Sequence, residues 1–188
     1  LNVTLTEHTL DSTLAYQGQF LAMRHDTVRL PDGRTATREY LNHPGAVAIF
    51  ALTADQSLLM VRQYRYPVRQ TFLEIPAGKI DPNESPLATA KRELAEETGY
   101  TARRWTALPV AHACIGYSDE RITYFVAEDL VAGEAHLDEG EFLQVLTLPL
   151  TDVQRQAAQG TLTDSKTLVG LYWLHAWQTG VLVLEPTV

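Results

Sequence analysis

The stretch GKIDPNESPLATAKRELAEETGY, from Gly78 to Tyr100, contains the clearest helix signal of the chain. Ser85 is a suitable N-cap, Pro86 fits the first turn, and Gly99 stands where glycine commonly ends a helix. These signals predict a helix from Pro86 to Thr98. The helix is rich in glutamates, so the purpose of these charges is the central question about the sequence.

The glutamates of this helix gather on one side of it. Glu93 and Glu97 are four residues apart and share a face, which Glu96 borders. Like charges at this spacing cost about 0.2–0.5 kcal/mol per pair, which a solvated charged surface tolerates. Carboxylates that converge from one face are also what Mg²⁺ needs when it bridges a protein to substrate phosphates, and Arg92 would orient Glu96. The residues alone leave both interpretations open.

The segments around this helix have the patterns of β-strands. Two strands are predicted within Ala46–Tyr66, broken near Asp55, and another over Thr71–Ile75. Short strands are expected before residue 45, with a turn at residues 31–33. The mixed order predicts the α+β class, with helices on the faces of a mixed sheet. The remaining elements are expected downstream: strands over Arg104–Ile115, Arg121–Glu128 and Leu143–Leu148, and a helix over Asp164–Gln178.

Composition and charge narrow the class of function. The net charge of −8 argues against a broad electrostatic grip on nucleic acid or on an anionic membrane. A phosphorylated substrate remains possible, because a bound divalent metal ion reverses the negative local field that the acidic residues create. The single cysteine, Cys114, excludes an internal disulfide, and the scattered histidines argue against a zinc site. We expect a soluble, cytoplasmic protein with no nucleic-acid or membrane partner.

The opening stretch resembles the Nudix box at each of its defining positions: Gly78, Glu84, Arg92, Glu93, Leu94, Glu96, Glu97, Gly99 and Tyr100. The resemblance implies an α/β/α sandwich in which the box forms a loop, a helix and a loop. It implies hydrolysis of nucleoside diphosphates linked to another group. Glu93, Glu96 and Glu97 would then be carboxylates of a metal site, with Mg²⁺ as the cofactor and Mn²⁺ as a substitute. Gly78 would let the chain turn tightly into the site.

The flanking segments are similar to one group of this family, the ADP-ribose pyrophosphatases. By this resemblance Arg65 approaches a substrate phosphate, the Ala77 carbonyl completes the metal site, and Phe20 stacks on adenine. Glu120 is a further substrate-binding candidate. Arg65 on a solvated strand face and Phe20 as a core aromatic are the alternatives. The similar segments are HPGAVAIF (43–50), VRQYRYP (61–67), LEIPAGKID (73–81), GYSDERI (116–122), DEGEF (138–142) and DSKTLVGLYWL (164–174).

One position departs from that group. A proline usually stands where this chain has Ile115, and proline would stiffen the loop near the terminal ribose. ADP-ribose, cleaved to AMP and ribose 5-phosphate, is the expected substrate, with GDP-mannose, other nucleotide sugars and dinucleotides as alternatives. A second alternative is a non-catalytic nucleotide-sensing module. The full set of box carboxylates and the lack of a basic DNA-binding segment argue against the sensor.

Two glutamates of DEGEF, Glu139 and Glu141, are candidates for activating the attacking water. A general base must reach that water, and carboxylates whose lone pairs bind metal are poorly suited to it. The resemblance suggests Glu139 as the base and Glu141 as an additional metal ligand, or the reverse. An acidic solvated loop is the alternative. The catalytic candidates are therefore Glu93, Glu97, Glu139 and Glu141.

The chain divides into two expected parts. Residues 1–44 form a strand-rich arm with an additional β-sheet, and residues 45–188 form the Nudix hydrolase domain. The long arm and the oligomerisation habit of the resembled group predict a homodimer, in which the arm helps to build the partner's substrate pocket.

Overall fold

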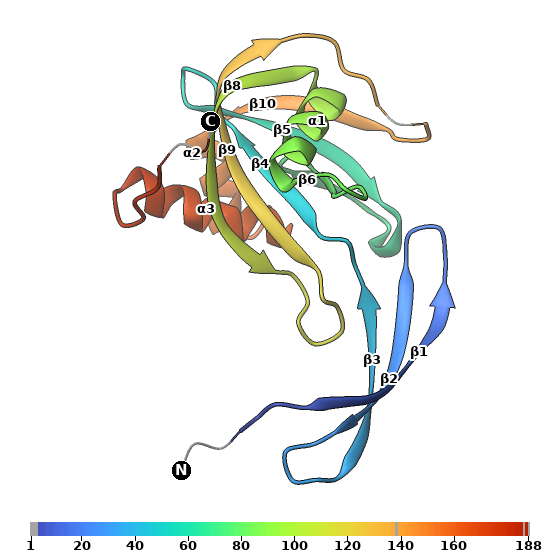
Figure 1. Ribbon diagram of the computed structural model, residues 1–188. Helices are drawn as coiled ribbons and strands as arrows, with labels where there is room; N and C mark the ends of the chain where they lie inside the picture. The colour runs from blue at the N-terminus through green and yellow to red at the C-terminus, as the bar shows by residue number, and fades with distance from the viewer. Residues whose placement is uncertain (1–3, 138, 186, 188) are drawn as a thin grey trace. The chain divides into compact units, whose positions relative to one another are not determined.

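The computed structural model describes residues 4–137, 139–185 and 187. It forms two compact units, one of Leu1–Pro44 with His112–Arg121 and the other of Gly45–Ala111 with Ile122–Val188. Three-stranded sheets occur in both, and the α-helices of the described chain all belong to the second unit (Figure 1). Antiparallel and mixed sheets combine with a small number of helices, which confirms the α+β class.

The first unit contains an antiparallel sheet of three strands. They are β1 (His8–Gln17), β2 (Ala22–Arg29) and β3 (Thr35–Asn42), in that spatial order. The predicted turn joins β2 to β3, and there the Arg34 amide donates to Asp32 Oδ1 at 3.0 Å. β1 is an edge strand of this sheet and all its residues are exposed.

The box helix α1 covers Pro86–Thr98, as predicted from its signals. The Ser85 side chain accepts a hydrogen bond from the Ala88 amide at 3.2 Å, which satisfies one of the free donors of the first turn. Gly99 ends the helix with φ of 76°, a conformation that glycine adopts without strain. The caps therefore fix both ends of the helix that carries the glutamates.

The second unit contains a mixed sheet in the order β7-β4-β9-β8. β4 runs parallel to β9 and antiparallel to β7, so the prediction of a mixed sheet is confirmed. β8 starts several residues earlier than predicted, because Gly99 directs the chain from α1 straight into the sheet. The strands are β4 (Ala46–Ala51), β7 (Ala77–Lys79), β8 (Tyr100–His112) and β9 (Arg121–Ala132).

A second, antiparallel sheet of this unit has the order β10-β5-β6. A single 3₁₀ turn, η1 (Tyr66–Val68), separates its β5 from β6. The predicted interruption near Asp55 is present, since β4 ends at Ala51 and β5 begins at Ser57. The strands are β5 (Ser57–Arg65), β6 (Gln70–Glu74) and β10 (Leu143–Pro149).

Helices cover both faces of the mixed sheet. Val47 and Ile49 of β4 pack in one core with Leu94 of α1. The alternate residue Phe50 points to the other face, where it meets α3 (Ser165–Gln178). A side chain at Gly170 of α3 would come within 2.2 Å of the Phe50 ring, so glycine permits this close packing. Figure 1 shows α1 and α3 on opposite sides, which is the expected α/β/α arrangement.

The helix α2 and the strand β7 were not predicted from the sequence. α2 (Leu150–Ala158) has Pro149 at its N-cap with no side-chain hydrogen bond there, so the usual start signal is missing. β7 is a three-residue strand, too short to show an alternating pattern. None of the described helices combines the length and the apolar character needed to cross a membrane.

Candidate active site

Glu97 is the most deeply buried glutamate of the box helix. Only 3% of it is exposed, and its Oε2 accepts a hydrogen bond from the Ala77 amide at 3.1 Å. Since α1 packs on β4 and β7, the helix delivers this carboxylate to the strand that carries Ala77. The structure thus brings together two of the predicted metal ligands.

Gly78 provides the space for the Glu93 carboxylate. A Cβ at Gly78 would lie 1.8 Å from Cδ of Glu93 and 1.9 Å from its Oε1. The expected turn at Gly78 is wrong, because this residue lies within β7 and does not have a positive φ. Glycine is needed here because the carboxylate rests directly against the strand.

Arg92 holds several box carboxylates at once. Its Nη1 donates to Glu93 Oε1 at 2.8 Å and to Glu96 Oε2 at 2.9 Å, so the expected contact with Glu96 is present. Its Nε and Nη2 donate to Glu84 at 3.2 and 2.9 Å. The hydrogen bonds with Glu84 are the main cause of the raised pKa of the Arg92 guanidinium. Arg92 therefore compensates much of the repulsion among these glutamates.

The pKa values show which carboxylates are destabilised in their ionised forms by burial and by neighbouring negative charges. Burial raises the pKa of Glu97 to about 8, and the charges of Glu93 and Glu141 contribute further. Burial also raises the pKa of Glu93, where Arg92 opposes the effect and Glu96 and Glu141 add to it. A divalent cation among these carboxylates would stabilise their ionised forms.

The donor set suits a cation that also binds substrate. Among residues 4–137, 139–185 and 187, no three His, Cys, Asp or Glu side chains form a ready metal cage. Mg²⁺ is usually held by one or two carboxylates together with waters and substrate phosphates. The half-buried Glu93 and the buried Glu97 fit this mode of binding. The surface of β7 at Gly78, on which the Glu93 carboxylate rests, is called the cradle below.

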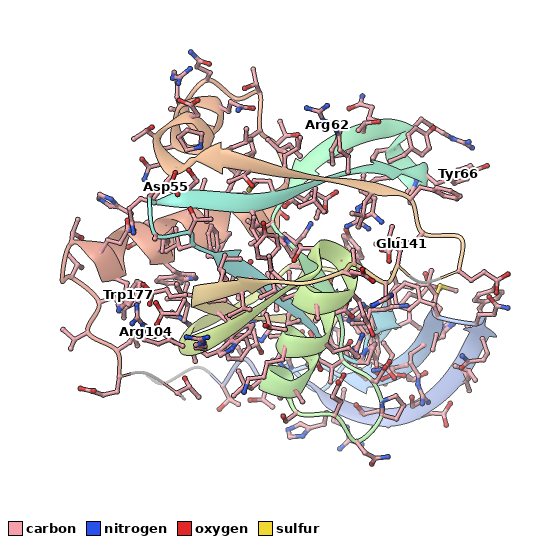
Figure 2. All side chains as sticks on the ribbon, turned by 90° about the horizontal axis from the view of Figure 1, so that it is seen from above. Asp55, Arg62, Tyr66, Arg104, Glu141 and Trp177 are labelled. Atoms are coloured by element: carbon pink, nitrogen blue, oxygen red, sulfur yellow. The ribbon has the colours of Figure 1, made fainter. Side chains whose placement is uncertain are left out.

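Glu141 lies in the loop that follows β9. Figure 2 labels its side chain. The Oε1 atom of Glu141 accepts a hydrogen bond from Gln63 Nε2 of β5 at 3.2 Å. The same loop is tied to the end of α1, because the His136 amide donates to the Glu96 carbonyl at 3.0 Å. Glu141 is therefore held close enough to affect the titration of Glu93 and Glu97.

Glu139 is exposed and differs from Glu141 in its surroundings. Within the described part of the chain it forms no hydrogen bond or ion pair, and it is not among the charges that shift the pKa of Glu97. Its neighbour Asp138 lies outside the described residues. The structure thus brings Glu141, and not Glu139, to the box carboxylates.

Arg65 ends β5, where its half-exposed side chain is paired with a buried carboxylate. Its Nε and Nη2 donate to Glu74 at 2.8 and 2.6 Å, and its charge lowers the pKa of Glu97. Glu74 and Lys166, which also contacts Glu74, were not predicted as site residues. A charged residue inside the apolar strand TFLEI was the signal that pointed to Glu74.

In the first unit, Phe20 and Glu120 both lie close to His43. The Phe20 ring meets the His43 ring edge to face at 5.4 Å, and Glu120 Oε1 lies 3.8 Å from His43 Nε2. Phe20 is 45% exposed, so its alternative interpretation as a core aromatic is wrong. His43 was not predicted as a site residue, although it begins one of the quoted segments.

Ile115 is the second residue of a turn in the same unit. The Tyr117 amide closes this turn on the Cys114 carbonyl at 3.0 Å, and the Ile115 side chain is 84% exposed. Proline is favoured at this position of a turn. The backbone of the chain thus already has the course that a proline would impose.

Two family models match the chain and adjoin each other. The model described as NUDIX domain matches residues 42–168, and the model described as Nucleoside diphosphate sugar hydrolase N-terminal domain matches residues 7–41. The boundary between them falls at the end of β3, just before the short connection to β4.

Two relatives are each 38% identical to this chain. The ADP-ribose pyrophosphatase of Bacillus subtilis matches over 92% of this chain and 94% of its own length. The methanol dehydrogenase activator of Bacillus methanolicus matches over 90% and 92%. A solved structure of an ADP compounds hydrolase has a TM-score of 0.82 at 22% identity and covers 95% of this chain and 97% of its own, so it shares the fold.

Proposed function

Because the chain belongs to the Nudix hydrolase family, we propose that it hydrolyses ADP-ribose to AMP and ribose 5-phosphate. Its general activity is hydrolysis of the pyrophosphate bond in a nucleotide sugar. The observation that carries this assignment is a complete box in a matched NUDIX domain that follows, along the chain, a matched N-terminal domain of nucleoside diphosphate sugar hydrolases. The name of the Bacillus subtilis relative supports ADP-ribose as the particular substrate.

Nudix hydrolases use divalent metal ions, and Mg²⁺ is the ion proposed here, with Mn²⁺ as a substitute. Its proposed ligands are the Ala77 carbonyl and the carboxylates of Glu93, Glu96, Glu97 and Glu141. When bound, such an ion neutralises charge on the pyrophosphate and favours deprotonation of a water molecule.

The reaction needs no covalent intermediate with the protein. The oxygen of a water molecule bonds to one phosphorus, the bridging P–O bond breaks, and the second phosphate leaves with the electron pair. Glu139 or Glu141 accepts the proton of the water. Arg65 places its fixed positive charge against a phosphate, and Phe20 stacks on the adenine.

Substrate preference is the direct test of this function. With Mg²⁺, we expect kcat/KM for ADP-ribose to exceed that for GDP-mannose by about tenfold or more, because the pocket is proposed to recognise the adenosine end. Release of phosphatase-susceptible product from a panel that also contains NADH and diadenosine polyphosphates provides the measurement. Equal or reversed efficiencies would assign another nucleotide sugar, and no turnover of the whole panel would favour the sensing module.

A homodimer built through the N-terminal sheet is also proposed. The support is β1, an exposed edge strand whose backbone groups offer hydrogen bonds to another chain. Light scattering at assay concentration measures the assembly, and a fully active monomer would contradict it. The charge of −8 and the single cysteine support a cytoplasmic enzyme without nucleic-acid or membrane partners.

The cradle at Gly78 gives a prediction that separates activity from stability. Gly78→Ala should lower turnover about 10²-fold, because the new methyl group displaces the Glu93 carboxylate from its place against β7. The unfolding temperature should change little, since only the flexible end of one side chain must move.

Steady-state kinetics and thermal unfolding of the same preparation measure the two effects. Glu93→Gln is the matched background, in which adding Gly78→Ala should cost little further activity. Full activity of Gly78→Ala, or equal losses in both backgrounds, would contradict the role of the cradle.

A further inference from the structure

Glu74 is a buried carboxylate that the proposed reaction does not use. It ends β6, and only 1% of the residue is exposed. A buried carboxylate is stable in its ionised form only when cations or hydrogen-bond donors compensate for the lost water. Two cations do so here, Arg65 and Lys166.

Arg65 meets Glu74 as a fork. Nε donates to Oε1 at 2.8 Å and Nη2 donates to Oε2 at 2.6 Å, so both groups lie in one plane. This pair uses one edge of the guanidinium. The edge that carries Nη1 has further N–H donors, and the Arg65 side chain is 42% exposed. The fork therefore fixes the direction in which the other edge points.

The carboxylate of Glu74 is itself fixed from the start of α3. Lys166 Nζ donates to Glu74 Oε2 and also to Asp164 Oδ1, the latter at 3.1 Å. Asp164 caps α3 by accepting a hydrogen bond from the Thr167 amide at 3.0 Å. Thr167 Oγ1 in turn accepts from the Ile75 amide at 3.1 Å, next to Glu74 in the chain. Helix and strand thus hold the carboxylate from two directions.

A pocket of about 270 Å³ has Val68 and Phe72 as apolar walls, and its charged lining residues are Arg65, Glu74, Asp164 and Lys166. Two cations and two carboxylates balance one another within it, so the pocket has no net charge to trap a free anion. Burial opposes ionisation of Glu74, but Arg65 and Lys166 outweigh it and hold the pKa of Glu74 below its usual value. The fork is therefore intact at neutral pH.

We propose that Glu74, braced by Lys166, is a positioning residue that aims the free edge of Arg65 at a phosphate of the substrate. This inference rests on the proposed function, in which Arg65 binds that phosphate. Arg65 also lies within electrostatic reach of Glu97, which stabilises its positive charge. A guanidinium fixed in plane and direction meets the phosphate without first losing rotational freedom.

A double-mutant cycle on kcat/KM for ADP-ribose tests the proposal with Arg65→Ala, Glu74→Gln and the double variant. Glu74→Gln should lower kcat/KM by about 10- to 100-fold, mostly through KM, because Arg65 binds substrate and transition state alike. In the Arg65→Ala background, Glu74→Gln should change kcat/KM by less than about twofold. A pair that only supports the fold would lower the unfolding temperature and leave KM unchanged.

The outcomes separate this inference from the proposed function. Normal kcat/KM in Arg65→Ala would remove the phosphate role of Arg65 and the inference with it. A loss in Arg65→Ala without a loss in Glu74→Gln, or with losses that multiply in the double variant, would overturn the inference alone. ADP-ribose hydrolysis would still stand in that case.

Two further variants keep the test decisive. If Glu74→Gln does not fold, Glu74→Gln/Lys166→Gln removes one charge of each sign and should show the same loss in kcat/KM; normal kcat/KM in it overturns the inference. Glu128→Gln is the matched control, because Glu128 accepts from Arg104 Nε at 3.0 Å in an ion pair joining β8 and β9. It should leave kcat/KM within about twofold of the wild type.

Discussion

Glu97→Gln should lower turnover of ADP-ribose by about 10³-fold, because the proposed metal site loses its most buried carboxylate. Glutamine keeps the size of the side chain, and its amide oxygen still accepts the hydrogen bond from Ala77. The loss should therefore reflect charge and not packing. Steady-state kinetics over a range of Mg²⁺ concentrations measures it, and wild-type rates in this variant would disprove the metal role of Glu97.

The pH dependence of the unfolding temperature tests the raised pKa of Glu97 separately from turnover. Folding raises the pKa of Glu97 from its usual 4.5 to about 8, so the native state binds this proton more tightly than the unfolded state does. In chelator, the native state loses stability as pH rises through that window. Glutamine does not ionise, so the unfolding temperature of Glu97→Gln relative to wild type should be higher at about pH 9 than at about pH 5. A relative stability that is independent of pH would contradict the raised pKa.

Glu139→Gln should lower turnover by about 10²–10⁴-fold with little change in substrate binding if Glu139 is the general base. Glu141→Gln should slow the reaction and also raise the Mg²⁺ concentration needed for half-maximal activity. Glu141 accepts a hydrogen bond from Gln63 and its charge acts on Glu97, so it lies near the box carboxylates, as the second effect requires.

Kinetics with Mg²⁺ titrations of both single variants and the double variant separate the two roles. If Glu141→Gln loses turnover without a shift in Mg²⁺ requirement, and Glu139→Gln shows that shift, the two assignments are exchanged. Glu134→Gln, an exposed glutamate of the same loop, is the control and should behave as wild type. Near-normal turnover in both singles and in the double would exclude this loop as the source of the base.

The local features of this protein follow from its sequence. The caps at Ser85 and Gly99 predict both ends of α1, and helical spacing predicts that Glu93 and Glu97 share a face. Strand patterns predict β4, β5 and β6 within a residue or two. In each case the determining contacts join residues close together in the chain, so propensity and spacing are sufficient.

The remaining features depend on contacts between distant segments. Glu74 and Lys166 are 92 residues apart, and their contact exists only because α3 begins beside the end of β6. Gly78 was predicted to be a turn residue. The reason for glycine at this position is its contact with Glu93, which the packing of α1 on β7 brings to it. Spacing in the sequence does not indicate contacts between such distant residues, so the roles of Glu74, Lys166 and Gly78 become visible only in the structure.

The contacts of Arg92 separate folding of the enzyme from its activation. A zinc finger is unfolded without its metal ion, because no other interaction holds its ligands together. Here a cation supplied by the box helix itself already pairs with Glu84, Glu93 and Glu96. Without metal ions, in the presence of chelator, the protein should therefore keep a cooperative unfolding transition. Metal binding would then reversibly change the activity of a protein that is already folded. The concentration of Mg²⁺ would then determine the turnover rate of each molecule, and not the fraction of molecules that is folded.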